Sequence, residues 1–329
     1  MKLSDFDYYL PKESIAQFPL KKRDESRLLV LDRQKETLEH RVFKDIVFFL
    51  KEGDLLVLND TKVLPCRLFG RRLTGGRVEV LLLKRKEGLR FDALMKPARL
   101  KVGEIINFNG GKVSGKIVNK NEINFQAKDV DEIYNIGLMP LPPYIKREPL
   151  DSDKLDYQTV YARCPGAVAS PTAGLHFTEE LIGQLKNRGI NFSYLTLHVG
   201  LGTFKPVKCE DVVSYSMEPE YFSIPEETQD AVRKARLDKK RIIAVGSTSL
   251  RALESFASGN KQGKTGLYIY PGYEFKVTDC LVTNFHLPKT TLFMLVCAFA
   301  GEKLAKKAYQ EAIDLKYRFY SYGDAMLIK

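Results

Sequence analysis

The sequence predicts an α/β fold in which a mixed α/β main domain is interrupted by an inserted small β-barrel domain. Two patterns indicate this. Six short β-rich stretches separated by turn residues follow one another between residues 63 and 128. On either side, residues 1–60 have a mixed α/β pattern and residues 155–329 alternate helix and strand patterns. We therefore place the main domain at residues 1–60 plus 152–329, and the inserted basic barrel at residues 61–151.

The inserted segment has the spacing of a small barrel or sandwich. Turn signals at residues 74–76, 86–88 and 109–111 separate its β-rich stretches. Met139 to Tyr144, with three prolines, then predicts a stiff extended connection back to the main domain. The six predicted strands lie in VLPCRLFG, RVEVLLLK, LRFDALMK, EIINF, KVSGKIV and EINFQAK.

In the rest of the chain, strands and helices meet at short polar or glycine-rich turns. Thr178 is placed to cap a helix that stops at Gly189. The strand at 241–246 leads into Ser247-Thr248-Ser249 and another helix. Further strands are predicted in FSYLTLHV, GLYIY and KVTDCLVTNF, and further helices over 292–300 and 302–318.

Charge is concentrated in the inserted segment. The chain has a formal net charge of +11. Between Lys62 and Lys128 there are 16 Lys and Arg against 5 Asp and Glu, so this segment alone carries the surplus. Such a block is typical of a surface that binds a polyanion, and it favours nucleic acid over a merely soluble, solvated surface.

Composition and motifs argue against several classes of protein. Asp5 and Asp7 stand where a signal peptide needs an apolar run, and the longest apolar run, 292–300, is too short for a bilayer. The five cysteines include no C-x-x-C pair, and the histidines lack the spacing of metal ligands. The stretch 259–265 lacks the glycine spacing of a P-loop, and Gly200-x-Gly202 lacks the third glycine of a dinucleotide site. We expect a cytoplasmic protein without metal or membrane contact.

Two histidines mark the candidate site. His176 follows a run of small residues, and His198 ends a predicted strand that leads into Gly200, Gly202 and Thr203. Backbone without bulky side chains lets a ligand approach, and imidazoles move protons near neutral pH. The alternative is a glycine-rich packing corner with hydrogen-bonded histidines. Likewise, the hydroxyls of residues 247–249 with Arg251 form either an anion or ribose cradle or an ordinary helix cap.

Eleven sequence blocks, spread from one end of the chain to the other, match those of one known family. In order, they are DFDYYLP, IAQFPL, SRLLVLDR, GDLLVLNDTKV, MPLPPYI, YQTVYA, PTAGLHFT, LHVGLGTFKPV, VGSTSLRALES, TNFHLP and RFYSYGDAMLI. On these blocks, the chain resembles the S-adenosylmethionine:tRNA ribosyltransferase-isomerase family of queuosine biosynthesis from end to end. Where that family usually has His after Ser216-Met217, this chain has Glu218. Cys66 and Ser170 stand at positions usually occupied by Ala.

The resemblance implies a mixed α/β body interrupted by a β-barrel, and an unusual reaction. The ribosyl part of S-adenosylmethionine moves onto the 7-aminomethyl-7-deazaguanine base of a tRNA anticodon and rearranges to give epoxyqueuosine. Adenine and methionine leave. S-adenosylmethionine is then a substrate, and no cofactor is expected. The partners are this tRNA and S-adenosylmethionine, and we expect a monomer.

This reaction needs positioned acids and bases, and the residues of this chain suggest a hypothesis for where they lie. We expect His176 to be the base or acid nearest the ribose, with His286 and His198 as alternatives. Asp60 either meets the aminomethyl cation or forms a turn, and Asp324 is equally ambiguous. Gly200, Gly202 and Thr203 would admit the methionyl or ribosyl part, and Ser247, Thr248, Ser249 and Arg251 would bind a carboxylate or hydroxyls.

Two rival functions fit less of the sequence. A non-catalytic RNA-binding protein explains the basic barrel but not the glycine and histidine cluster. A metal-dependent hydrolase explains the histidines but requires ligand spacing that the chain lacks. Adenine release from S-adenosylmethionine and the metal content of the purified protein separate these alternatives.

Overall fold

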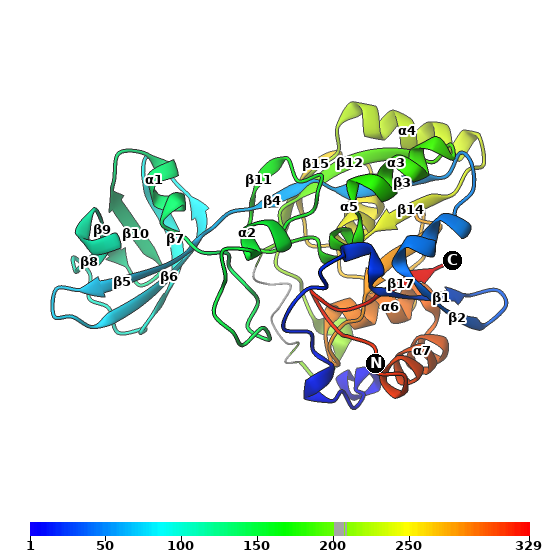
Figure 1. Cartoon of the computed structure of the whole chain (residues 1–329), viewed down its shortest axis with the longest axis horizontal. Helices are drawn as coiled ribbons and strands as arrows, with labels where there is room; N and C mark the ends of the chain where they lie inside the picture. The colour runs from blue at the N-terminus through cyan, green and yellow to red at the C-terminus, as the bar shows by residue number, and fades with distance from the viewer. Residues whose placement is uncertain (201–206, 208) are drawn as a thin grey trace.

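A computed structural model describes residues 1–200, 207 and 209–329 of the chain. The main body is built on a nine-stranded sheet with the order β15-β13-β12-β3-β14-β16-β17-β1-β2 (Figure 1). The central strands β12, β3, β14 and β16 are parallel, and β17 runs antiparallel to β16. The strands are β1 (Arg27–Asp32), β2 (Thr37–Val42), β3 (Leu55–Asn59), β12 (Asn191–Leu197), β13 (Glu220–Ser223), β14 (Ile242–Val245), β15 (Gln262–Thr265), β16 (Cys280–Asn284) and β17 (Ala325–Ile328).

Both faces of this sheet are buried, as the continuous apolar runs of its central strands require. Successive side chains of β3 point to opposite faces: Leu55 and Val57 join one core, and Leu56 and Leu58 join the other. The first core is closed by α4 (Glu226–Leu237), α5 (Ser247–Ala257), α6 (Thr291–Ala300) and α7 (Glu302–Asp314). The second is closed by α3 (Glu179–Asn187) and the 3₁₀ segments η4 (Phe43–Phe48) and η6 (Thr172–His176).

The inserted segment forms a closed barrel of six strands in the order β10-β7-β6-β5-β8-β9, seen on the left of Figure 1. Alternate residues of β6 are buried, as period-two patterning predicts, and they pack with Leu68 and Phe91 inside the barrel. The strands are β5 (Arg67–Arg72), β6 (Arg77–Arg85), β7 (Arg90–Lys96), β8 (Ile105–Phe108), β9 (Val113–Asn119) and β10 (Glu122–Gln126), followed by α1 (Val130–Asn135).

The chain leaves and re-enters the body along two neighbouring segments. β4 (Thr61–Val63) leads out from β3, and β11 (Cys164–Ala167) pairs with it in parallel on the way back. Between them, α2 (Asp153–Asp156) lies on the return path. The remaining 3₁₀ segments are η1 (Leu3–Phe6), η2 (Lys12–Ser14), η3 (Arg23–Glu25), η5 (Asn109–Gly111) and η8 (Val212–Ser214).

The predicted fold class is confirmed, and all six barrel strands fall on the predicted stretches. The exact domain bounds of 61 and 151 stay a prediction.

Two predicted elements differ from the structure. GLYIY was predicted as a strand, and this is wrong: β15 ends at Thr265. The carbonyls of Thr265 and Leu267 accept hydrogen bonds from the Arg251 side chain. The last helix ends at Asp314 and not at 318, because Lys316 has a φ of 57°.

Candidate active site at the carboxyl edge of the sheet

The candidate site lies where the parallel strands of the body end. The carboxyl ends of β3, β14 and β16 bring Asn59, Gly246 and Asn284 to one edge of the sheet. Because β17 is antiparallel to β16, the segment before Ala325 reaches the same edge. Ligands of open α/β sheets bind in the crevice outside the carboxyl ends of the strands.

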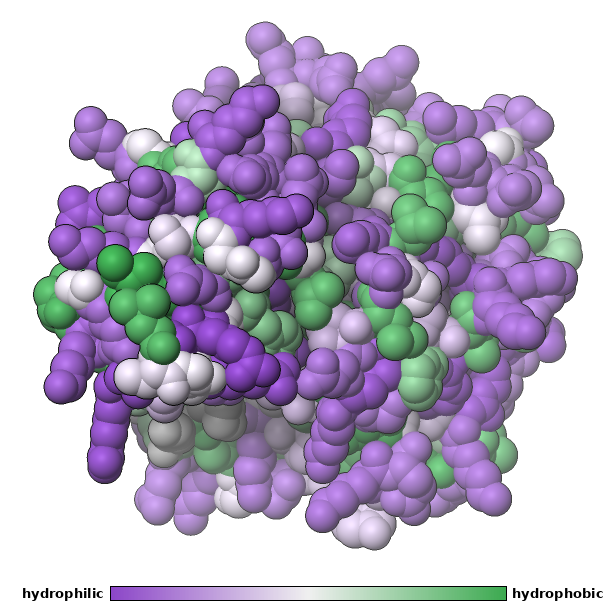
Figure 2. All heavy atoms as spheres, turned by 60° about the vertical axis from the view of Figure 1, so that its left-hand side comes forward, coloured by the Kyte–Doolittle hydropathy of each residue, from purple (hydrophilic) through white to green (hydrophobic). Residues whose placement is uncertain are grey.

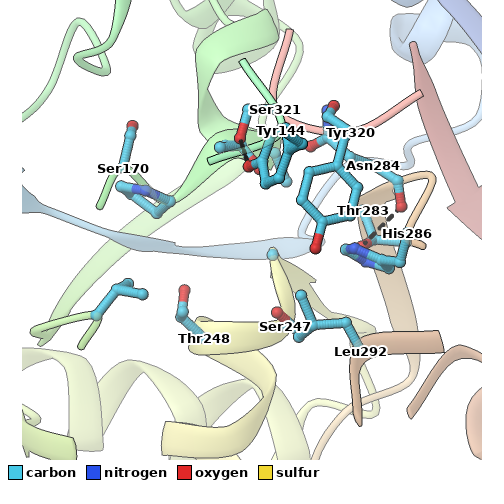
Figure 3. A pocket seen from close by; sticks show the side chains of 15 residues that line it. Tyr144, Ser170, Ser247, Thr248, Thr283, Asn284, His286, Leu292, Tyr320 and Ser321 are labelled. Atoms are coloured by element: carbon cyan, nitrogen blue, oxygen red, sulfur yellow. Dashed lines mark hydrogen bonds between the residues drawn. The ribbon is translucent and has the colours of Figure 1, made fainter. Parts of the chain in front are cut away.

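A cavity of about 500 Å³, counting its open mouth, occupies this edge. Figure 3 shows Ser247, Thr248 and Leu292 on one side of the cavity and Tyr144, Tyr320 and Ser321 on the other. The complete lining is Tyr144, Ser170, Pro171, Thr172, Ala173, Val199, Gly246, Ser247, Thr248, Thr283, Asn284, His286, Leu292, Tyr320 and Ser321.

The first turn of α5 faces the cavity with two of the three predicted hydroxyl residues. Gly246 precedes the helix with a φ of 91°, a conformation that glycine adopts without strain. Ser247 and Thr248 line the cavity, and Thr248 Oγ1 accepts a hydrogen bond from Asn59 Nδ2 at 3.1 Å. A helix N-terminus favours negative charge, so this wall suits a carboxylate or sugar hydroxyls. Ser249 is fully buried and is not part of the lining.

His286 is the histidine that lines this cavity. Its Nε2 lies 2.8 Å from Thr283 Oγ1, and its backbone N–H donates to the Tyr309 hydroxyl. The Tyr8 hydroxyl donates to its carbonyl. Burial lowers the pKa of His286 from 6.5 to about 3, so the imidazole is neutral at physiological pH. The neutral imidazole is a weak base in the empty site, so a role in proton removal requires a bound substrate that stabilises the protonated ring.

His176 is buried just behind the cavity. Its Nδ1 lies 2.7 Å from Ser26 Oγ and its Nε2 lies 3.2 Å from Asn284 Nδ2. The ring stacks on Phe43 with centroids 4.9 Å apart. Burial lowers the pKa of His176 to about 3, and the nearby Arg318 guanidinium adds to this effect. Both ring nitrogens are therefore engaged within the protein. His176 does not line the cavity at the carboxyl edge; it lines a separate cavity of about 330 Å³ together with Ser26 and Ser321.

His198 and Asp60 lie at the crossing to the barrel and outside the cavity lining. His198 Nδ1 lies 2.8 Å from Thr61 Oγ1, and burial lowers the pKa of this histidine. Asp60 accepts a hydrogen bond from Thr196 Oγ1 at 2.7 Å and forms an ion pair with Arg163 at 3.0 Å. These contacts engage both carboxylate oxygens of Asp60 in the protein's own structure.

Arg251 does not reach the cavity. Its guanidinium pairs with the buried carboxylate of Glu220, whose other oxygen accepts a hydrogen bond from the backbone N–H of Gly200 at 2.8 Å. We therefore leave Arg251 out of the proposed binding site. Gly200 is held beside this ion pair, while Gly202 and Thr203 lie outside the described residues.

Several lining residues were not singled out from the sequence. Tyr144 and Tyr320 stack edge to face with centroids 3.8 Å apart, and the Tyr144 hydroxyl lies 2.5 Å from Ser321 Oγ. They come from segments 176 residues apart, so only the aromatic and polar mixture of each block could have indicated them. Asp324 instead has a structural role: it accepts hydrogen bonds from the backbone N–H groups of Arg27 and Arg318.

Within the described ranges, no group of three His, Cys, Asp or Glu residues is arranged to hold a metal ion. The same residues include no helix long and apolar enough to cross a membrane.

Comparison with known proteins identifies the family. The queuosine biosynthesis protein family matches residues 3–328. The chain belongs to this family. A relative from Carboxydothermus hydrogenoformans is 51% identical over 339 residues, and one from Thermosipho africanus is 52% identical over 338. Both comparisons cover 100% of each chain, and both relatives are named S-adenosylmethionine:tRNA ribosyltransferase-isomerase.

A solved structure supports the fold. The crystal structure of S-adenosylmethionine tRNA ribosyltransferase from Thermotoga maritima is 38% identical to this chain, with a TM-score of 0.58. The match covers 99% of this chain and 100% of that one. The solved relative therefore supports the mixed α/β fold with its barrel in this chain.

Proposed function

We propose that this protein is an S-adenosylmethionine:tRNA ribosyltransferase-isomerase. The observation that carries this proposal is identity of about half of all residues, over the full length of both chains, with relatives that bear this name. The substrate base is 7-aminomethyl-7-deazaguanine in a tRNA anticodon, and the product is epoxyqueuosine. The protein acts as a monomer in the cytoplasm, and S-adenosylmethionine serves as substrate without a separate cofactor.

The chemistry starts from the sulfonium charge of S-adenosylmethionine. This charge acidifies the 5′ carbon of the ribose, so that a base is able to remove a proton there. The aminomethyl nitrogen of the tRNA base receives the ribosyl part, adenine leaves with a proton, and the ring rearranges as methionine departs. Each step needs a positioned acid, base or hydrogen-bonding group.

The cavity at the carboxyl edge is the proposed site for S-adenosylmethionine. Ser247 and Thr248 at the start of α5 suit its carboxylate or ribose hydroxyls. His286 is the proposed proton-moving group, because it is neutral and lines the cavity. We choose His286 over His176 because both ring nitrogens of His176 already form hydrogen bonds within the protein. We choose it over His198 because His198 does not line the cavity.

The barrel is the proposed tRNA-binding surface. Figure 2, with the barrel side turned forward, shows a face covered mainly by hydrophilic side chains. Lys84 and Arg85 at the end of β6 are exposed and form no ion pair within the described part of the chain. By contrast, Arg72 pairs with Glu104, and Lys86 pairs with Asp92. Unpaired cations contact phosphates without first breaking an internal ion pair.

The function is tested by incubating the protein with S-adenosylmethionine and tRNA that carries 7-aminomethyl-7-deazaguanine. We expect tRNA-dependent release of adenine and methionine, and epoxyqueuosine in the nuclease digest by mass spectrometry. The matched control is the same tRNA with guanine at that position, which should give neither product. Binding of the modified tRNA without adenine release would instead support a non-catalytic RNA-binding protein.

A further inference from the structure

Asn284, the last residue of β16, has a buried side-chain carbonyl oxygen that no described residue engages. Its Nδ2 donates to the carbonyl of Tyr320 at 3.0 Å and lies 3.2 Å from His176 Nε2. Its Oδ1 has no hydrogen-bond partner in the described structure, although the residue is only 2% exposed. Asn284 also lines the cavity at the carboxyl edge (Figure 3).

The orientation of this amide is fixed by its neighbours. The carbonyl of Tyr320 only accepts hydrogen bonds, so it requires the NH₂ group of Asn284 on its side. The opposite orientation would place two oxygen acceptors against each other. With Nδ2 held there, His176 Nε2 must accept from it, which puts the imidazole proton on Nδ1. That proton is then donated to Ser26 Oγ at 2.7 Å.

Ser26, His176 and Asn284 therefore form a chain of hydrogen bonds that ends at a cavity-lining residue. A buried carbonyl without a donor costs free energy, and a bound ligand that supplies the donor recovers it. We propose that Asn284 Oδ1 accepts a hydrogen bond from S-adenosylmethionine and that His176 is a positioning residue that holds the amide in place. This inference rests on the proposed function.

This assignment gives His176 a different role from the proton transfer expected from the sequence. A base needs a free lone pair, and the Nε2 lone pair of His176 already accepts from Asn284. Stacking on Phe43 further fixes the ring plane. The donor on S-adenosylmethionine is the adenine amine, a ribose hydroxyl or the methionyl ammonium.

The first experiment measures the Kd of S-adenosylmethionine by calorimetry for the wild type and Asn284→Ala. We expect binding to weaken about tenfold or more, because the ligand donor loses its acceptor. Three analogues, each lacking the purine amine, the 2′-hydroxyl or the α-amino group, identify the donor. The analogue that lacks the relevant donor should bind wild type and Asn284→Ala equally well.

The second experiment separates positioning from proton transfer. Gln in place of His176 offers an amide oxygen to Asn284 but cannot act as a base near neutral pH. We expect His176→Ala to weaken S-adenosylmethionine binding and His176→Gln to restore much of it, together with the rate. His40→Ala is a matched control, because His40 also has two side-chain partners, Tyr317 and Glu311, but lies at the edge strand β2.

Two results would overturn the inference while leaving the proposed function intact. One is a folded Asn284→Ala variant that binds S-adenosylmethionine with wild-type affinity. The other is a His176→Gln variant as inactive as His176→Ala with ligand binding retained, which would assign proton transfer to His176. If Asn284→Ala fails to fold, the two His176 variants decide the question. A wild type that does not bind S-adenosylmethionine would overturn the function and the inference together.

Discussion

Arg163 Nη2 lies 3.0 Å from Asp60 Oδ2, at the point where the chain crosses between the body and the barrel. The carboxylate is buried, with 4% of its side chain exposed, whereas the guanidinium side chain is 58% exposed. Arg163 also lies over the ring of Tyr194. This ion pair joins the end of β3 to the segment just before β11, so it holds the two crossing segments together.

Asp60 is therefore expected to act on stability more than on catalysis. Asp60→Asn keeps an acceptor for Thr196 Oγ1 and leaves only an exposed cation unpaired, so the free energy of unfolding should fall by about 1 kcal/mol at most. Arg163→Ala leaves the buried carboxylate without its cation and should cost more, about 1–3 kcal/mol. Urea unfolding measures both. A stable Asp60→Asn variant with a strongly raised KM for tRNA would show that Asp60 contacts the substrate instead.

Replacing His286 should affect turnover directly. If its imidazole moves a proton in the transition state, His286→Ala and His286→Gln should both lower kcat by about 10²–10⁴. The Kd of S-adenosylmethionine should change little, because the proton moves only on the way to the transition state. Single-turnover adenine release is the measurement. A folded His286→Gln variant with a near-normal rate would rule out this role.

Acid should destabilise the folded protein through its two most deeply buried histidines. Burial lowers the pKa of His176 and of His286 from 6.5 to about 3. Between these values the unfolded chain binds protons that the folded chain does not, so stability falls as the pH drops below about 6.5. The slope approaches about 1.4 kcal/mol per pH unit for each histidine.

Urea unfolding at pH 7.5, 6 and 5 tests this expectation. The double variant His176→Gln/His286→Gln should have a flatter pH dependence than the wild type over the same range. An equally steep decline in the double variant would assign the acid sensitivity to other groups.

S-adenosylhomocysteine should bind the same cavity without reacting. Its neutral thioether neither acidifies the 5′ carbon enough nor leaves well, whereas the contacts to the adenosyl and amino acid parts remain. Adenine release is followed with tRNA present, and competition with S-adenosylmethionine confirms binding. Ribosyl transfer from the thioether would exclude a mechanism that starts with proton removal next to the sulfonium.

The basic barrel should supply most phosphate contacts. Lys84→Ala/Arg85→Ala should weaken tRNA binding and flatten the plot of log Kd against log salt, because each lost contact removes close to one released counterion. Lys86 is left in place, since it pairs with Asp92 and Glu122. The matched control, Lys303→Ala/Lys307→Ala, removes two exposed cations from α7 of the body. Equal salt slopes for both variants and the wild type would place the RNA elsewhere.

The sequence predicted the barrel well because each of its strands is short, alternates in burial and is bounded by turn residues. It also predicted α3, whose cap Thr178 accepts a hydrogen bond from the Leu181 backbone N–H. These features are local. GLYIY had the composition of a strand, but the backbone carbonyl of its Leu267 accepts a hydrogen bond from the Arg251 side chain, and that contact depends on a helix earlier in the chain.

The candidate site was predicted only in part, because many of its contacts join residues that are far apart in the sequence. Ser247, Thr248 and His286 line the cavity, as the ends of predicted strands suggested. His176 was identified, but its partners Ser26 and Asn284 lie 150 and 108 residues away, so its role could not be read from neighbouring residues. Likewise, Arg251 pairs with Glu220, which is 31 residues away in the sequence. Glu220 lies in no sequence motif that would have indicated this ion pair.

The barrel is formed by one continuous stretch of the sequence, and this has a consequence for the order of folding. All six barrel strands lie within residues 67–126, whereas β3 must find β12 and β14 far along the chain. Contacts between distant residues form slowly, since a long loop must close first. A barrel that forms early shortens that loop to the gap between its own two ends. We therefore expect the barrel to gain hydrogen-exchange protection during refolding before the central strands of the body do.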